Sequence, residues 1–482
     1  MDTIEYSKVI AVWIAVALLS LMVLAACGNG LEVGVVSTPT AEVAATATPS
    51  TLTTETPSPP TQVATLAVPA PTPTPSLGKL AYVQGGDIWV KALPDGEPQC
   101  LTTDGRNQEP RWSPSGEWLA FRKEAQVWLV QADGNASHPL WEGGPVSTFA
   151  WSPAEDRLAY VAGSGVLRLE TIHADGTDPA TLLIPLSICA LGQLGRIAWS
   201  PDGAWIAYEW LERQPDQPLT YQGLWKVSAD GKEQTELYAS GMPEKGVALL
   251  AGWSPDGQHI LFWQGDILSA SLQADGVPLY SLPAGGGEPI KLVDAALVHD
   301  DFVAPAPQGD GLAVAAGEYR ATWTSKGVAV VGVDGGELVW LTDESVAAFS
   351  PAWSPDGVHL AYVAMPDRGD LVGGEDARLG MMERRIWVVN AQGKPQPQQF
   401  TDDPAYRDER PLWSADGSHP LFARLDAEGR ASLWLIPARD GDPHRVVDEL
   451  GPFSGPASDW FGYYGHVEWD PLFDWWRGPQ DD

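Results

Sequence analysis

The chain has 482 residues, of which 44% are apolar, and it carries a formal net charge of −34. Such an acidic chain repels phosphate backbones, so its composition excludes nucleic acid as a partner and favours solubility outside the cell. With 50 Gly, 42 Pro and 23 Trp and many short apolar runs, the composition favours an all-β fold.

The chain begins with an apolar run from Val9 to Leu24, which ends in Leu-Ala-Ala-Cys at Cys27. The run is shorter than the about 20 residues of a membrane-spanning helix and is typical of a signal-peptide core. Its end resembles the bacterial lipobox, in which the Cys is acylated and the peptide is cut just before it. The resemblance implies a signal peptide over residues 1–26 and a lipid on Cys27.

The charges before the apolar run depart from this pattern, because Asp2 and Glu5 offset Lys8 where a positive charge is expected. An uncleaved anchor helix is the alternative. Both interpretations predict an exported protein, anchored to the cell membrane or the outer membrane with the rest of the chain outside the cytoplasm.

A linker is predicted to follow over residues 27–76. Residues 37–76 consist mainly of Ala, Thr, Pro and Ser and contain no aromatic residue. Such a stretch cannot bury enough apolar surface to offset the entropy of ordering it, so we expect it to be disordered.

From Leu77 onward a short phrase repeats, with the sequence Trp-Ser-Pro-Asp-Gly or a near copy. It begins at Trp112, Trp151, Trp199, Trp253, Trp353 and Trp413, with a decayed copy at Pro307. Ser, Pro and Gly at the first, second and fourth positions of Ser-Pro-Asp-Gly are typical of a type I turn. Two apolar runs of strand length follow each copy, and a further pair precedes the first one.

This repeat resembles the WD40-like (PD40) repeat of TolB-type β-propellers, in which four antiparallel strands form a blade. The resemblance implies a single all-β propeller over residues 77–472, with eight blades and seven as the alternative. Residues 466–471 are expected to complete the first blade, so that strands from the two ends of the chain close the ring and leave no open edge. Residues 473–482 would then be a tail.

Few residues suggest chemistry. His299, Asp300 and Asp301 form the one compact group of His and carboxylates, but a metal site needs further ligands that the sequence does not place. The sequence therefore predicts no metal and no cofactor. We assign the repeated Trp to packing between blades and the turn Asp to hydrogen bonds within their own turns.

An aromatic run near the end of the chain lies outside the repeat. Trp460, Tyr463, Tyr464 and His466 are candidate binding residues, because clustered aromatic side chains can present a flat apolar platform. The alternative is packing against the first blade.

No GxSxG, HExxH, P-loop or GxGxxG motif occurs in the chain. The sequence therefore predicts a protein that is not an enzyme, a monomeric binding or scaffold module for a protein or glycan, held at the membrane by its lipid. The alternative is an extracellular metal-assisted polysaccharide lyase or another glycan-processing propeller enzyme. Convergence of His299, Asp300 or Asp301 with other polar groups at the mouth of the channel would favour the alternative.

Overall fold

The computed structural model describes residues 76–478, except 165, 184–190, 214–218, 240–245, 266–275, 308, 310, 370–373, 440 and 452–463. The predicted signal peptide, Cys27 and the linker lie outside these residues, as do Trp460 and Tyr463. Within the described part, no helix is long and apolar enough to cross a membrane.

The described residues form antiparallel sheets, six with four strands and one with eight. The four-stranded sheets are β1 (Lys79–Gln84), β2 (Asp87–Ala92) and β3 (Gln99–Cys100) with β32 (Phe473–Trp476); β4 (Asn107–Trp112), β5 (Trp118–Lys123), β6 (Gln126–Gln131) and β7 (Ser137–Pro139); β8 (Val146–Trp151), β9 (Arg157–Ala162), β10 (Arg168–His173) and β11 (Ala180–Leu183); β12 (Leu191–Trp199), β13 (Trp205–Arg213), β14 (Leu219–Ser228) and β15 (Gln234–Ala239); β24 (Val346–Trp353), β25 (His359–Pro366), β26 (Arg385–Asn390) and β27 (Gln398–Gln399); and β28 (Tyr406–Trp413), β29 (Pro420–Asp426), β30 (Ala431–Leu435) and β31 (His444–Leu450).

The eight-stranded sheet contains two units of the same pattern. Its strands are β16 (Val247–Trp253), β17 (His259–Gly265), β18 (Val277–Pro283), β19 (Ile290–Ala296), β20 (Val303–Pro305), β21 (Gly311–Ala316), β22 (Gly327–Gly332) and β23 (Val339–Trp340). One residue pair, Ala296 with Ala316, joins the two units across β19 and β21. The fold is the predicted all-β propeller. Its blade number stays a prediction, because an eight-bladed ring requires this sheet to count as two blades.

The Ser-Pro-Asp-Gly segments form the expected turns. In the turn at Ser200, the Gly203 N–H donates to the Ser200 carbonyl at 2.9 Å, and the Ser200 hydroxyl donates to Asp202 at 2.5 Å. The Gly has a φ of 68°, a left-handed conformation that favours glycine. Asp202, Asp256, Asp356 and Asp416 each bond within their own turn, as predicted, whereas Asp310 lies outside the described residues.

The repeated Trp residues join neighbouring sheets. Apart from Trp112, whose indole N–H has no hydrogen-bond partner among the described residues, each indole N–H donates to a main-chain carbonyl of the preceding unit, at 2.9–3.1 Å. These pairs are Trp151 to Arg111, Trp199 to Ala150, Trp253 to Ala198, Trp353 to Ala304 and Trp413 to Ala352. The prediction that these Trp pack between blades is confirmed.

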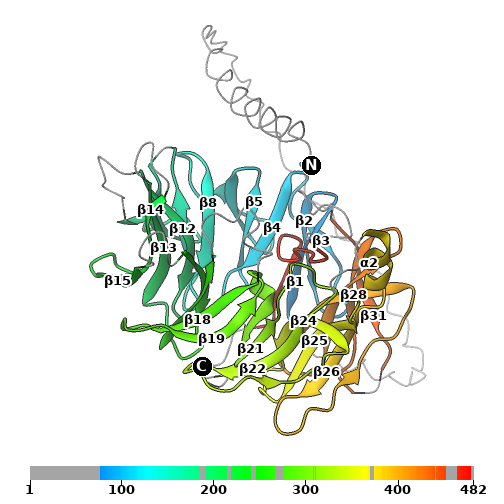
Figure 1. Ribbon diagram of the computed structural model, residues 1–482. Helices are drawn as coiled ribbons and strands as arrows, with labels where there is room; N and C mark the ends of the chain where they lie inside the picture. The colour runs from blue at the N-terminus through cyan, green and yellow to red at the C-terminus, as the bar shows by residue number, and fades with distance from the viewer. Residues whose placement is uncertain are drawn as a thin grey trace, which may run out of the picture. The chain divides into compact units, whose positions relative to one another are not determined.

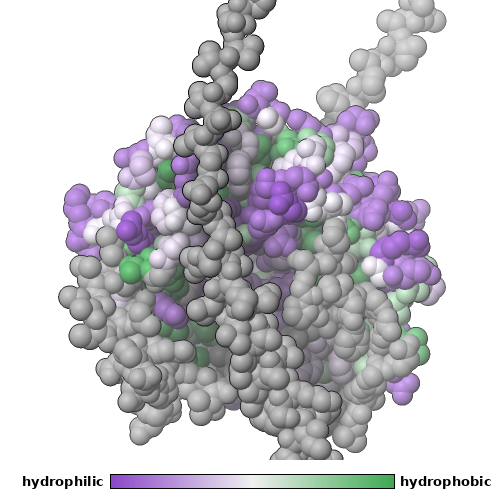
Figure 2. Space-filling model, turned by 90° about the horizontal axis from the view of Figure 1, so that it is seen from above, coloured by the Kyte–Doolittle hydropathy of each residue, from purple (hydrophilic) through white to green (hydrophobic). Residues whose placement is uncertain are grey.

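The core lies between adjacent sheets. Trp118 and Leu129 of the second sheet, for example, share a hydrophobic cluster with Leu158 and Tyr160 of the third. Both faces of the middle strands are therefore buried, which explains their continuous apolar runs. Outside the sheets lie the helix α2 (Gly374–Met381) and the 3₁₀ turn η3 (Asp300–Phe302). The face in Figure 2 is mostly hydrophilic among its coloured residues, as the net charge of −34 leads us to expect.

Strands from the two ends of the described chain close the ring, but the closing strand differs from the expected one. β32 pairs antiparallel with β1, from Lys79 opposite Trp476 to Tyr82 opposite Phe473. In Figure 1 the red C-terminal segment accordingly lies beside the blue strands β1 and β2. The closing strand thus lies in residues 473–476, which the sequence assigned to a tail. The prediction that residues 466–471 form the closing strand is wrong.

We predict that removing residues 473–482 causes aggregation or loss of cooperative unfolding, because it exposes the edge of β1 and open edges pair with other chains. The control is removal of residues 479–482, which keeps β32. Light scattering and thermal unfolding of both truncated proteins provide the test. A monomer with an unchanged melting temperature after the longer truncation would contradict closure by β32.

Candidate metal centre at the middle of the ring

Residues 464–472, which we call the C-terminal plug, cross the centre of the ring before β32 begins. Main-chain carbonyls of the plug accept hydrogen bonds from segments that are far apart in the sequence. The donors are Thr322 N to Tyr464, Arg384 Nη1 to Gly465, Glu109 N to Pro471 and Val83 N to Leu472, at 2.7–3.0 Å. The plug therefore runs from the sheet of β22 to that of β1.

The plug brings His466 against His299, which precedes η3 in the connection from β19 to β20. The two imidazole rings stack with their centroids 3.8 Å apart and an interplanar angle of 22°. Both residues are buried, with 4% of His299 and 3% of His466 exposed. The ring of Phe302 lies 5.0 Å from the first ring and 5.2 Å from the second, so an aromatic side chain helps to hold both.

Glu468 of the plug completes a group of three possible ligands. Its Oε1 lies 3.6 Å from His299 Nδ1 and 4.0 Å from His466 Nδ1. The three ligand atoms lie within 4.8 Å of one another. Among the described residues, neither Nδ1 has a hydrogen-bond partner. Ligands that bind a metal at about 2.0–2.2 Å in tetrahedral geometry are about 3.4 Å apart, and a metal lies in the plane of each imidazole that binds it. One shared ion would therefore require these atoms to move closer and the two stacked rings to turn.

A carboxylate behind His466 orients this ring. His466 Nε2 lies 2.9 Å from Asp301 Oδ1, and the Ser350 hydroxyl donates to Asp301 Oδ2 at 2.7 Å. Because an ionised carboxylate only accepts, Nε2 carries a proton and Nδ1 is the atom directed at the Glu468 side. Metal-binding histidines usually have such a carboxylate on the second ring nitrogen.

The surroundings shift the pKa values of the two histidines in opposite directions. Burial lowers the pKa of His299, and the neighbouring His466 lowers it further, so His299 favours the neutral form that binds metals. Burial also lowers the pKa of His466, but Asp301 and Glu468 outweigh this effect and raise it. Burial raises the pKa of Asp301, yet His466 and Arg410 hold it well below its usual range. A metal ion would therefore replace the Nδ1 proton of His466, whose ring lies between the carboxylates of Asp301 and Glu468.

One side of the group is open. The Glu468 side chain is 55% exposed, whereas the His299 side chain is 2% exposed. Three protein ligands with an open position are typical of catalytic metal sites, whereas structural sites are closed by four. A small molecule can thus approach the group from the Glu468 side.

Buried ion pairs fix the plug on both sides of this group. Arg384 lies 2.6 Å and Arg407 3.0 Å from Glu409 Oε1, and the Trp469 indole donates to Glu409 Oε2 at 2.9 Å. Arg384 also binds the carbonyl of Gly465 at 2.7 Å. The residues before His466 and after Glu468 are therefore held by one ionic network.

The structure brings only some of the predicted site residues into the group of His299, His466 and Glu468. His299 belongs to the group, and Asp301 supports it through His466. Asp300 pairs with Arg196 at 2.8 Å and is 63% exposed, so it is not one of the three possible ligands. His466, predicted as part of an exposed platform, is buried, whereas Tyr464 is 36% exposed. Trp460 and Tyr463 lie outside the described residues.

Sequence reasoning missed Glu468, because residues 466–471 were assigned to a strand. A signal was present: residues two apart in extended backbone point to the same side, so His466 and Glu468 were candidates for one site.

No family model matches the chain, and no curated protein is significantly similar to it in sequence. Several solved structures have a similar fold. The dipeptidyl peptidase 4 of Porphyromonas gingivalis is 12% identical with a TM-score of 0.54, and the match covers 78% of this chain and 60% of that one. An oligogalacturonate lyase in complex with manganese is 16% identical with a TM-score of 0.44, covering 80% and 89%. A TolB-like protein described as putative, from Agrobacterium tumefaciens, is 19% identical with a TM-score of 0.33, covering 59% and 90%.

At these identities the comparisons show the fold alone. This chain spans only 50–60% of the length of the peptidases that it matches. They nevertheless correct one expectation. The sequence predicted a protein that is not an enzyme, but the similar structures with a TM-score above 0.5 include a dipeptidyl peptidase 4 and a putative dipeptidyl aminopeptidase IV. Lack of familiar catalytic motifs was therefore no ground for excluding catalysis.

The ionic network gives a prediction about stability. Replacing Glu409 by Gln should lower the free energy of unfolding by about 3 kcal/mol or more, because it leaves Arg384 and Arg407 buried without their carboxylate. The matched control is Glu428→Gln, at an exposed residue. Denaturant unfolding of both variants measures the difference, and equal stability would contradict the role of the network.

Proposed function

We propose that this protein is an exported, lipid-anchored propeller enzyme with a divalent metal ion at the middle of its ring, and that it processes a glycan there. His299, His466 and Glu468 would hold the ion. One observation carries the proposal: two buried imidazole Nδ1 atoms without hydrogen-bond partners among the described residues face one carboxylate, within 4.8 Å of one another.

The donor set indicates the kind of metal. Two imidazole nitrogens and one carboxylate oxygen suit first-row transition metals such as Zn²⁺, Fe²⁺ and Mn²⁺, whereas Ca²⁺ requires six to eight oxygens. A bound ion would supply Lewis-acid activation of a substrate oxygen or an activated water. Of the chain's own residues, Asp301 orients His466, and the exposed side of Glu468 leaves room for the substrate.

A glycan is the substrate class that this site favours. Hydroxyl and carboxylate oxygens of sugars are suitable ligands for the open side of such an ion. Arg196, which is 34% exposed and pairs with the exposed Asp300 next to His299, could exchange this partner for a sugar carboxylate. Binding of a glycan or protein at the Glu468 side, next to Arg196, would then be the first step of the reaction.

The membrane anchor is part of the same proposal. The lipobox at Cys27, the apolar run before it and the Pro/Thr-rich linker after it support export and lipidation. The linker would let the propeller reach substrates at a distance from the membrane.

The metal proposal predicts that the full-length protein, treated with EDTA and then titrated with Zn²⁺ or Mn²⁺, binds one ion per chain. The melting temperature should rise, because the ion binds only the folded chain; at 100 times the Kd the gain is about 2.7 kcal/mol. His299→Ala should abolish the effect, and Asp301→Asn should weaken affinity by about 10–100-fold. Calorimetry and thermal melts measure both quantities.

His359→Ala is the matched control, because His359 lies at a repeat position outside the group. Activity on a glycan panel should disappear on chelation and return on reloading in the wild type and in His359→Ala, but not in His299→Ala. A wild type that binds neither ion, or a His299→Ala variant that binds like the wild type, would contradict the proposal.

The anchor predicts that mature protein begins with a diacylated or triacylated Cys27. Cys27→Ala should leave the uncleaved precursor in the membrane, whereas Cys100→Ala should be processed normally. Intact-mass analysis distinguishes these species. Mature material that still contains Met1 would rule out lipobox processing.

A further inference from the structure

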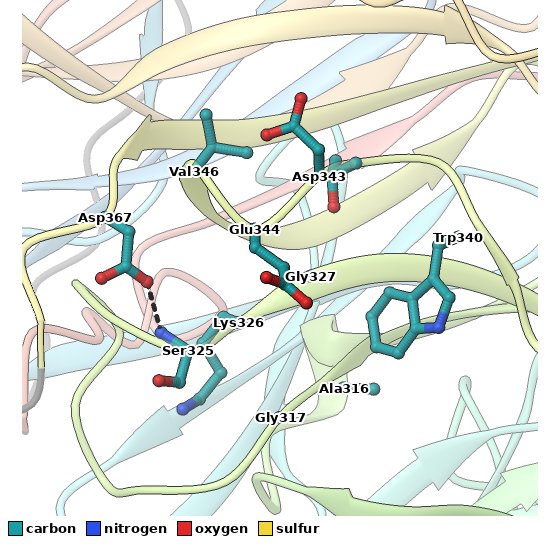
Figure 3. A pocket seen from close by; sticks show the side chains of 11 residues that line it. Ala316, Gly317, Ser325, Lys326, Gly327, Trp340, Asp343, Glu344, Val346 and Asp367 are labelled. Atoms are coloured by element: carbon teal, nitrogen blue, oxygen red, sulfur yellow. Dashed lines mark hydrogen bonds between the residues drawn. The ribbon is translucent and has the colours of Figure 1, made fainter.

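A cavity of about 680 Å³ lies between the unit of β21–β23 and the sheet that begins with β24. Its lining includes Lys326, Trp340, Asp343, Glu344 and Asp367 (Figure 3). The volume is within the range of pockets that hold small ligands. The cavity shares no lining residue with the metal group.

Trp340 presents an indole to this cavity. The ring packs against Gly327, where an added Cβ would come within 2.7 Å of it, yet Trp340 is 47% exposed. It lies on β23, a strand of two residues. Indole rings normally bury most of their surface, so a half-exposed ring at a cavity suggests a face kept for a ligand.

Three carboxylates surround the same space. Asp343 accepts the Ser345 N–H at 2.8 Å, and Asp367 accepts the Ser325 N–H at 2.7 Å. Hydrogen bonds from Ser345 lower the pKa of Asp343, which keeps it ionised. In Figure 3 the Glu344 carboxylate points into the space between Trp340 and Lys326. It is the carboxylate best placed to meet a ligand.

Lys326 offsets only part of the negative charge of these acids, through its attraction to Asp367. It is 2% exposed, and its ammonium donates to the main-chain carbonyls of Glu318, Tyr319 and Thr324. Burial lowers its pKa to about 8. Its hydrogen bonds are thus used within the loop that precedes β22, and the cavity retains a net negative charge.

We propose that this cavity binds a cationic amino sugar, with the sugar ring stacked on Trp340 and the ammonium group at Glu344. An ammonium group is attracted both to an indole face and to carboxylates. A metal ion would make no use of the indole, and a neutral sugar would leave the carboxylates without a counter-charge. The proposal is independent of the metal centre and adds a second place where a glycan chain is held.

Calorimetry with the full-length protein tests the proposal with three probes of equal length: a glucosamine trisaccharide, the neutral glucose trisaccharide with the same linkage, and trilysine. We expect the glucosamine trisaccharide to bind at least about tenfold more tightly than the other two, and less tightly as salt increases. Trp340→Ala and Glu344→Gln should each weaken it by about tenfold or more. Their melting temperatures should stay near that of the wild type, because both side chains are exposed.

Trp141→Ala and Glu142→Gln are matched controls, since these residues line another groove between neighbouring sheets. They should bind the glucosamine trisaccharide like the wild type. Equal affinity for the neutral trisaccharide, tighter binding of trilysine, or no effect of Trp340→Ala and Glu344→Gln would each overturn the proposal.

Discussion

Pairing of β32 with β1 is the constraint on which the rest of the structure depends. The last strand pairs with the first sheet, and the chain that precedes it crosses the middle of the ring. Without that pairing, β1 would expose an open edge and the plug would have no fixed end. The same crossing places His466 and Glu468 opposite His299. Closure of the fold and assembly of the candidate metal centre therefore involve the same C-terminal segment.

The crossing is costly, because it takes charged groups out of water. Glu409 compensates by binding Arg384 and Arg407, and the Trp469 indole adds a hydrogen bond from the plug. The metal group, like Arg384 Nε of this network, contains buried nitrogen atoms without a hydrogen-bond partner among the described residues. Its two Nδ1 atoms have no hydrogen-bond partner among the described residues, and unsatisfied buried polar atoms are rare in stable proteins. A bound ion would remove this cost for the metal group.

The sequence was informative wherever local chemistry determines structure. Each Ser-Pro-Asp-Gly segment specifies its own turn, and the Trp before it recurs at one position in six of the seven described sheets, so the repeat predicted the fold. It was misleading where contacts are long-range. The closing strand lies a few residues later than expected, because Phe473–Trp476 and residues 466–471 are both apolar enough for a strand. His299 and Asp301 were noticed as a pair, but their partners lie about 165 positions away along the chain.

The most direct test of this account is a crystal structure of the full-length protein soaked with Zn²⁺, with data collected on both sides of the zinc absorption edge. The account predicts one strong anomalous peak within bonding distance of His299 Nδ1, His466 Nδ1 and Glu468, and none in His299→Ala crystals. A wild-type map without a peak at this position, with the three side chains placed as described here, would show that the group is an ionic cluster and would contradict the metal centre.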